Sequence, residues 1–197
     1  KTEWEKLGQR QQILVDWLNG REQIEIHGDY VDISFSIKGR KFISADGKSN
    51  MPDGEIFTGP VEDSAEGHVE FTYPAIEGGH VVENVRLSFE KGKVVKAQAD
   101  KNQDFLEVMI ATDEGSCYLG EFGIGTNFGI QRFTKQILFD EKIGGTFHLA
   151  LGAGFPETGS INKSGIHWDL ICALGRDGEI IVDGQALFKN GNFVLWT

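Results

Sequence analysis

The chain has 197 residues, 40% of them hydrophobic and 25% charged, which is enough to bury the core of one large domain or two small ones. Its 30 acidic and 19 basic side chains give a formal net charge of −11. Because nucleic acid and anionic membranes are bound by clustered Lys and Arg, we expect neither as a partner. No apolar run approaches the roughly 20 residues that span a bilayer.

The N-terminal residues predict an amphipathic helix from Thr2 to about Asn19, not a signal peptide, with Gly20 as its C-cap. The apolar residues that recur near helical spacing are Trp4, Leu7, Leu14, Trp17 and Leu18. We expect this stripe to pack against another domain or a partner subunit.

From Gln23 onward the apolar residues alternate with polar ones, which predicts strands joined by short turns. The alternating runs are 24–26, 31–37, 42–43, 69–73, 85–89 and 94–95. Asp100 is a suitable N-cap for a second helix whose apolar stripe covers 105–110. Further apolar segments follow at 119–129, 147–151 and 167–174, with closing strands at 179–182 and 193–196.

These elements predict an α+β fold that is rich in strands, with antiparallel or mixed sheets that are partly barrel-like. The N-terminal helix and one or two further helices complete it. Low-complexity linkers are absent from the sequence, and its Gly-rich stretches, 123–129 and 144–159, lie beside polar residues that a core would exclude.

Two glutamates are candidates for a functional site. Glu55 follows a turn of Pro and Gly at the start of a short apolar strand, where most glutamates are solvated. Glu121 lies among apolar and Gly residues, so we expect it to be buried. A buried carboxylate needs a cation, an Arg or backbone N–H groups as its partner.

Two histidines and an aspartate are the other candidates. His148 is enclosed by apolar strand residues, as many hydrogen-bonded core histidines are. His167 and Asp169 are two residues apart on a predicted strand, so both side chains point to the same face. Such a pair suits a divalent ion with nitrogen and oxygen ligands, although a simple His–Asp hydrogen bond is commoner.

Together the candidates offer three carboxylates, two imidazoles and no sulfur. This set is too rich in carboxylate for a single structural zinc. It is typical of a pair of ions about 3.5–4 Å apart that share a water and a bridging carboxylate.

Several segments, in order along the chain, resemble those of the thermophilic metallo-aminopeptidases, the family of the aminopeptidase T, aminopeptidase S and PepS-like enzymes. The segments are 51–60, 120–127, 140–152, 155–159 and 167–169. The resemblance runs from about Gly20 to the C-terminus. One departure is Phe155, where the family often has a Tyr whose hydroxyl is near the metals.

The resemblance implies a cytoplasmic exopeptidase that removes N-terminal residues from peptides with two divalent ions (zinc, cobalt, manganese or magnesium) and usually forms a homodimer. It implies metal ligands at Glu55, Glu121, His148, His167 and Asp169. It also implies that residues 1–197 are the C-terminal catalytic domain, with 1–20 as a leading helix and without the family's N-terminal α/β domain.

The expected mechanism is hydrolysis of the peptide bond by a water that two metal ions activate. Glu141 and Glu157 are the candidates for moving its proton to the leaving amine. Their structural alternatives are an ion pair of Glu141 with Lys142 or Arg132, and a turn cap made by Glu157.

Three other functions remain open from sequence. The chain is a catalytically weakened metal- or peptide-binding domain if catalysis is lost through Phe155, in place of the family Tyr, or through the isolation of this half of the enzyme. A carbohydrate-binding domain is less favoured, because Trp4 and Trp17 belong to the predicted helix. A cysteine hydrolase is least favoured, because Cys117 and Cys172 have no nearby His-bearing motif, and their lack of a zinc-ligand spacing fits a reducing, cytoplasmic setting.

Overall fold

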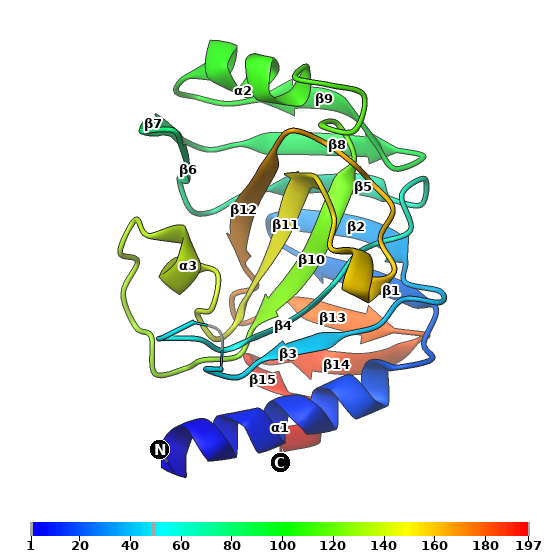
Figure 1. Cartoon of the computed structure of the whole chain (residues 1–197), viewed down its shortest axis with the longest axis vertical. Helices are drawn as coiled ribbons and strands as arrows, with labels where there is room; N and C mark the ends of the chain where they lie inside the picture. Colours follow the sequence, from blue (N-terminus) through cyan, green and yellow to red (C-terminus); the bar gives the residue numbers. More distant parts are fainter. Residues whose placement is uncertain (1, 49, 197) are drawn as a thin grey trace.

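The computed structural model describes residues 2–48 and 50–196 (Figure 1). Within this part of the chain, an eight-stranded sheet has the strand order β15-β14-β13-β1-β2-β5-β8-β9. Its strands are β1 (Gln23–Gly28), β2 (Val31–Ser36), β5 (Glu66–Glu70), β8 (Arg86–Glu90), β9 (Lys93–Gln98), β13 (Glu179–Val182), β14 (Gln185–Lys189) and β15 (Asn192–Phe193). A five-stranded sheet has the order β12-β11-β10-β4-β3. Its strands are β3 (Ile43–Ala45), β4 (Glu55–Thr58), β10 (Leu119–Gly125), β11 (Thr146–Gly152) and β12 (His167–Ala173).

A hairpin, the 17-residue helix α1 and shorter helices complete the described chain. The hairpin and helices are β6 (Ala75–Glu77), β7 (His80–Val82), α1 (Thr2–Leu18), α2 (Gln103–Ile110), α3 (Ile137–Asp140) and the 3-10 turns η1 (Pro156–Thr158) and η2 (Val194–Trp196). The named strands pair antiparallel throughout. The predicted α+β class is confirmed, and the described sheets do not close into a barrel. No described helix is long and apolar enough to cross a membrane.

The core lies between the two sheets, whose strands cross in Figure 1. Phe122 of β10 packs edge-on against Phe35 of β2, with ring centroids 5.0 Å apart. All residues of β10 and β11 are buried, so these strands are covered on both faces. Where β10 and β11 form it, the face of the smaller sheet that points away from the core is therefore also shielded from water, whereas His167 and Asp169 of β12 are partly exposed.

Helix α1 lies across the end of both sheets, near β3 and β14 (Figure 1). Leu14 and Leu18 are buried in the common core, so the expectation that this stripe packs against another domain or subunit is wrong for these residues. The helix ends at Leu18, and Gly20 has a φ of 87°, as expected for its C-cap.

Two predicted boundaries are wrong and one strand was not predicted, each for a local reason. Helix α2 begins at Gln103, and its N-cap position is Asn102 in a left-handed conformation, because Asp100 instead accepts hydrogen bonds from Asn84 and Arg86. The closing strand stops at Phe193, and the residues after it form η2. Strand β14 was not predicted, because its sequence has no clear alternation.

Gln11 joins α1 to the smaller sheet. It is fully buried, and its Nε2 lies 3.0 Å from the Glu55 carbonyl oxygen, 2.9 Å from Thr126 Oγ1 and 3.1 Å from the Ala45 carbonyl oxygen. Ser44 Oγ donates to its Oε1 at 3.0 Å. One amide side chain thus satisfies polar groups of β3, β4 and the end of β10.

We expect the substitution Gln11→Ala to lower the free energy of unfolding by about 1–3 kcal/mol, because it leaves buried carbonyls without a donor. Gln12→Ala is the matched control, since Gln12 is exposed and bonds only Asp16 on the same helix among the contacts described. It should change stability by less than about 0.5 kcal/mol. Urea unfolding measures both, and equal losses would contradict the role of Gln11.

Candidate metal centre

The five predicted metal ligands come together on one face of the smaller sheet. Strand alternation places Phe122 and Trp168 toward the core, and it places the residues next to them on the opposite face. The side chains on that opposite face are Glu55 of β4, Glu121 of β10, His148 of β11, and His167 and Asp169 of β12.

Small residues make room for this cluster. Gly123 is the cross-strand partner of His148, and a Cβ at Gly123 would collide with the imidazole ring. Ala150 is paired with Glu121 on one side and with Asp169 on the other. The sheet therefore carries large ionisable side chains only where the neighbouring strand offers space.

Carboxylates and imidazoles alternate along the cluster. His148 Nε2 lies 3.2 Å from Glu55 Oε2 and 3.3 Å from Glu121 Oε1. His167 Nε2 lies 3.1 Å from Glu121 Oε2 and 3.5 Å from Asp169 Oδ1. Glu121 is thus central, because each of its two oxygens faces a different imidazole.

The backbone fixes which nitrogen of His167 faces the cluster. Its Nδ1 lies 2.7 Å from the carbonyl oxygen of Ala153, which can only accept, so Nδ1 carries the proton. In the neutral ring the lone pair is then on Nε2, which faces Glu121 and Asp169. This is the arrangement that orients metal-binding histidines in proteins.

The segment after α3 adds two charged side chains to the cluster. Glu141 is buried, and one of its carboxylate oxygens lies within 4.8 Å of a ligand atom of His148 and of Asp169. It contacts Lys142, as the ion-pair alternative stated, and Lys142 Nζ also lies 2.7 Å from Glu55 Oε1. Lys142 was not predicted as a site residue; the sequence shows only that it follows Glu141 directly, and the burial of both side chains is evident from the structure alone.

Glu157 differs from Glu141. It is exposed on η1 and takes no part in the contacts described for the cluster, so its role in proton transfer stays a prediction. Phe155, just before that turn, packs edge-on against His167 and Phe57, with ring centroids 5.0 and 5.3 Å away. The aromatic ring therefore borders the cluster.

Proximity of opposite charges dominates the electrostatics of the imidazoles. Burial lowers the pKa of His167, but the neighbouring carboxylates of Asp169 and Glu121 outweigh burial and raise the pKa to about 11. Burial likewise lowers the pKa of His148, and the contact with Glu121 and the charge of Glu55 raise it to about 10. Both rings hold a second proton at neutral pH unless another cation takes its place.

The carboxylates divide into two kinds. Burial raises the pKa of Glu121, but the hydrogen bonds from His148 and His167 lower it to about 2. Burial raises the pKa of Glu55 to about 8, and the positive charges of His148 and Lys142 offset this effect only in part. Burial also raises the pKa of Glu141.

The donor atoms fit a divalent metal ion. Three overlapping groups of ligand atoms lie within 4.8 Å of one another: Glu55, Glu121 and His148; Glu121, His167 and Asp169; and Glu141, His148 and Asp169. The buried oxygens Glu55 Oε2 and Asp169 Oδ1 make no hydrogen bond in the described chain. Buried acceptors without donors are costly, and a cation would satisfy them.

The chain matches the model of the thermophilic metalloprotease (M29) family over residues 1–193, and it belongs to this family. It is 33% identical to aminopeptidase AmpS of Bacillus subtilis over 92% of its own length and 52% of that protein. It is also 33% identical to aminopeptidase T of Thermus thermophilus, over 72% of its own length and 37% of that protein. The predicted family is confirmed, and the chain spans about half the length of the curated relatives it matches or less.

Two solved structures have folds similar to that of this chain. Wild-type AmpT from Thermus thermophilus superposes on 98% of the chain and 55% of its own, with a TM-score of 0.85 and 25% identity. The 2,5-dihydroxypyridine dioxygenase of Pseudomonas putida KT2440 superposes on 98% of the chain and 60% of its own, with a TM-score of 0.76 and 19% identity. The second likeness concerns the fold alone.

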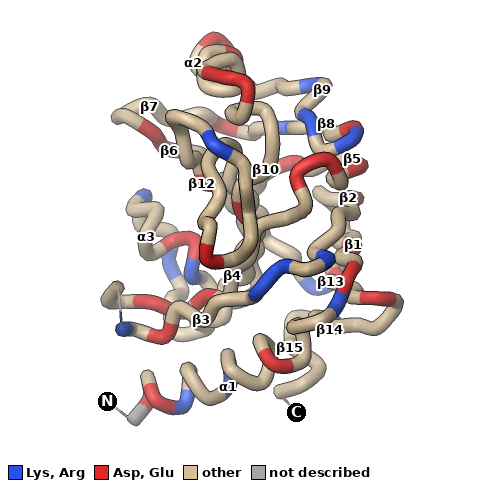
Figure 2. Tube along the Cα trace, turned by 45° about the vertical axis from the view of Figure 1, so that its right-hand side comes forward, with Lys and Arg blue, Asp and Glu red and all other residues tan. Residues whose placement is uncertain are grey.

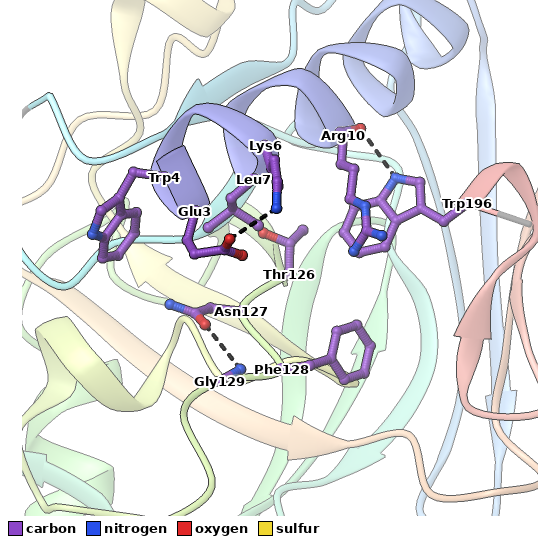
Figure 3. A pocket seen from close by; sticks show the side chains of 10 residues that line it. All are labelled: Glu3, Trp4, Lys6, Leu7, Arg10, Thr126, Asn127, Phe128, Gly129 and Trp196. Carbon is purple, nitrogen blue, oxygen red and sulfur yellow. Dashed lines mark hydrogen bonds and ion pairs between the residues drawn. The ribbon is translucent and has the colours of Figure 1, made fainter. Parts of the chain in front are cut away.

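Two other features of the molecule lie apart from the cluster. A cavity of about 560 Å³ opens between α1, the segment 126–129 and Trp196, where Arg10 stacks over the indole ring (Figure 3). Both cysteines are buried, and burial raises the pKa of the Cys172 thiol to about 12. A protonated, buried thiol does not favour the cysteine hydrolase alternative.

We expect Gly123→Ala to weaken metal binding by about 10- to 100-fold, because the added methyl group displaces the His148 ring. Gly165→Ala is the matched control, since a Cβ there makes only an ordinary contact with Asp113. Calorimetric titration of the metal-free variants with Zn²⁺ measures the affinities. Unchanged affinity in Gly123→Ala would show that His148 takes no part in binding.

Proposed function

We propose that this chain is the metal-binding, catalytic part of a metallo-aminopeptidase that hydrolyses N-terminal residues from peptides. The observation that carries the proposal is the convergence of five side chains on one sheet face, with Glu55, Glu121 and His148 buried and His167 and Asp169 partly exposed. Family membership supports a metal-dependent protease. Relatives named aminopeptidase support the exopeptidase activity.

Two divalent ions are proposed, with Glu121 as the residue shared between them. Its two oxygens face His148 and His167 separately, and each imidazole has a second carboxylate neighbour, Glu55 for one and Asp169 for the other. This symmetry supports two ligand sets joined by one carboxylate. Zinc, cobalt, manganese and magnesium all accept such ligands.

Bound divalent ions would supply Lewis-acid chemistry, lowering the pKa of a water and polarising the scissile carbonyl. The side chains of the protein would hold the metal ligands in place and move the proton of the water. Glu141 is the proposed proton carrier, because it lies beside the cluster without being one of the five proposed ligands, and burial raises the pKa of its carboxyl group. Acidic residues are spread over many elements, with basic ones interspersed (Figure 2). The net charge of −11 would favour the cationic N-termini of peptides.

The assignment to one half of a longer enzyme is part of the same proposal. We infer that residues 1–197 correspond to the C-terminal domain of the family, with 1–20 as a leading helix. A cytoplasmic location and a homodimer are proposed with it, because they follow from the family resemblance.

We expect the chain to bind two ions and the variants Glu121→Gln and His167→Ala to bind fewer, because each removes a ligand. Elemental analysis after dialysis against metal gives the stoichiometry. Glu90→Gln, at an exposed strand end, is the control and should bind two. If the unaltered chain binds no ion at saturation, the five-ligand assignment is wrong.

Hydrolysis of a leucyl reporter substrate completes this test, with aminopeptidase AmpS as the positive control for the assay. Metal-dependent hydrolysis by the chain supports the aminopeptidase. If two ions bind but no hydrolysis follows, the weakened metal- or peptide-binding domain becomes the better account. Phe155→Tyr, which restores the family hydroxyl beside His167, would then be the variant in which to look for recovered activity.

We expect Glu141→Gln to lower kcat by about 10²- to 10⁴-fold, because it removes the proposed proton carrier. Glu157→Gln is the paired variant. It should leave kcat within about twofold, because Glu157 is exposed and away from the cluster contacts. Steady-state kinetics with the metal-loaded enzyme measures both, and the reverse ranking would assign proton transfer to Glu157.

A further inference from the structure

Lys142 is a buried cation inside an acidic cluster. Its side chain is only 1% exposed, and it is the only Lys or Arg among the buried residues of the described chain. Its Nζ lies 2.7 Å from Glu55 Oε1 and contacts Glu141 Oε1. Burying an ammonium costs several kcal/mol unless it is paired, and here two carboxylates pair with it.

The backbone holds Lys142 and Glu55 in a fixed relation. The carbonyl oxygen of Lys142 accepts a hydrogen bond from Asn127 N at 3.0 Å, and Asn127 Nδ2 donates to the carbonyl oxygen of Asp53 at 2.8 Å. Thr126 N donates to the carbonyl oxygen of Gly54 at 2.9 Å. Lys142 and Glu55 therefore lie on segments that hydrogen bonds hold together.

The ammonium occupies one oxygen of Glu55 and leaves the other unbonded. Oε2 of Glu55 is buried, makes no hydrogen bond in the described chain and lies 3.2 Å from His148 Nε2. A free carboxylate can rotate and can offer one or both oxygens to a metal. With Oε1 held by Lys142, Glu55 offers Oε2 alone, on the side of His148.

We propose that Lys142 is a positioning residue for the metal centre, whose ammonium selects the oxygen that Glu55 presents and holds Glu141 beside it. The proposal rests on the proposed function, because it assigns Glu55 to a metal. It adds to the site a residue that is not a ligand. The role belongs to the geometry of the hydrogen bonds and not to the charge of Lys142 alone.

Geometry and charge predict opposite results when the ammonium is removed. If Lys142 served only as a positive charge, it would repel a divalent ion, and a neutral side chain would make metal binding tighter. If Lys142 positions Glu55, its loss frees the carboxylate to rotate and makes binding weaker. Loss of a residue that orients a metal ligand typically lowers the metal affinity 10- to 100-fold.

The experiment compares Zn²⁺ affinity, by calorimetric titration of the metal-free chain, between Lys142→Met and the unaltered protein. We expect a 10- to 100-fold loss. Lys189→Met is the matched control, since Lys189 Nζ also lies 2.7 Å from a carboxylate, Glu179 Oε1, but Lys189 is an exposed residue at the end of strand β14. It should bind Zn²⁺ as the unaltered protein does. Lys142→Gln, with a polar end, is the second variant should Lys142→Met fail to fold.

The absorption spectrum at saturating Co²⁺ separates positioning from loss of stability. A variant that is merely less stable gives the unaltered spectrum once folded and saturated, whereas a changed ligand at Glu55 alters the spectrum. Equal or tighter Zn²⁺ binding by a folded neutral variant, or an unaltered Co²⁺ spectrum, would overturn the role of Lys142. A different result, no metal binding by the unaltered protein, would contradict the proposed function itself.

Discussion

The alternation of side chains across a doubly covered sheet is the constraint on which this molecule depends. In β10, β11 and β12, one set of residues fills the apolar core and the next set forms the ionisable cluster. A shift of register by one residue would exchange the two sets, placing Glu121 and His148 among phenylalanines. The core and the cluster therefore specify the same register, and neither can be formed without the other.

Each residue around the cluster relieves one unfavourable interaction, which is a steric clash, an unpaired polar group or charge repulsion. Gly123 leaves room for the His148 ring, and the carbonyl of Ala153 satisfies Nδ1 of His167. Lys142 offsets part of the charge of the buried carboxylates, which would otherwise repel one another. What remains is a set of acceptors without enough donors, and this imbalance is the physical basis for proposing cations there.

Sequence predicted the parts of this arrangement that depend on local pattern. The spacing of His167 and Asp169 placed both on one strand face, and the apolar setting of Glu121 indicated burial, as the structure has it. Strand β14 was missed because its polar and apolar residues do not alternate clearly. The start of α2 was missed because the sequence pattern does not show that Asp100 accepts a hydrogen bond from Arg86. The contact of Lys142 with Glu55 joins residues 87 positions apart, and no local pattern encodes such a pairing.

The amide of Gln11 has a consequence for how the chain opens. It spans from α1 to the carbonyl of Glu55 and to Thr126, so the middle of the helix and the Glu55 side of the cluster share hydrogen bonds. The first turn of α1 can fray without touching these bonds. An opening that reaches Gln11 uncovers the backbone beside Glu55 as well, so this helix and the edge of the cluster form one unit of local unfolding.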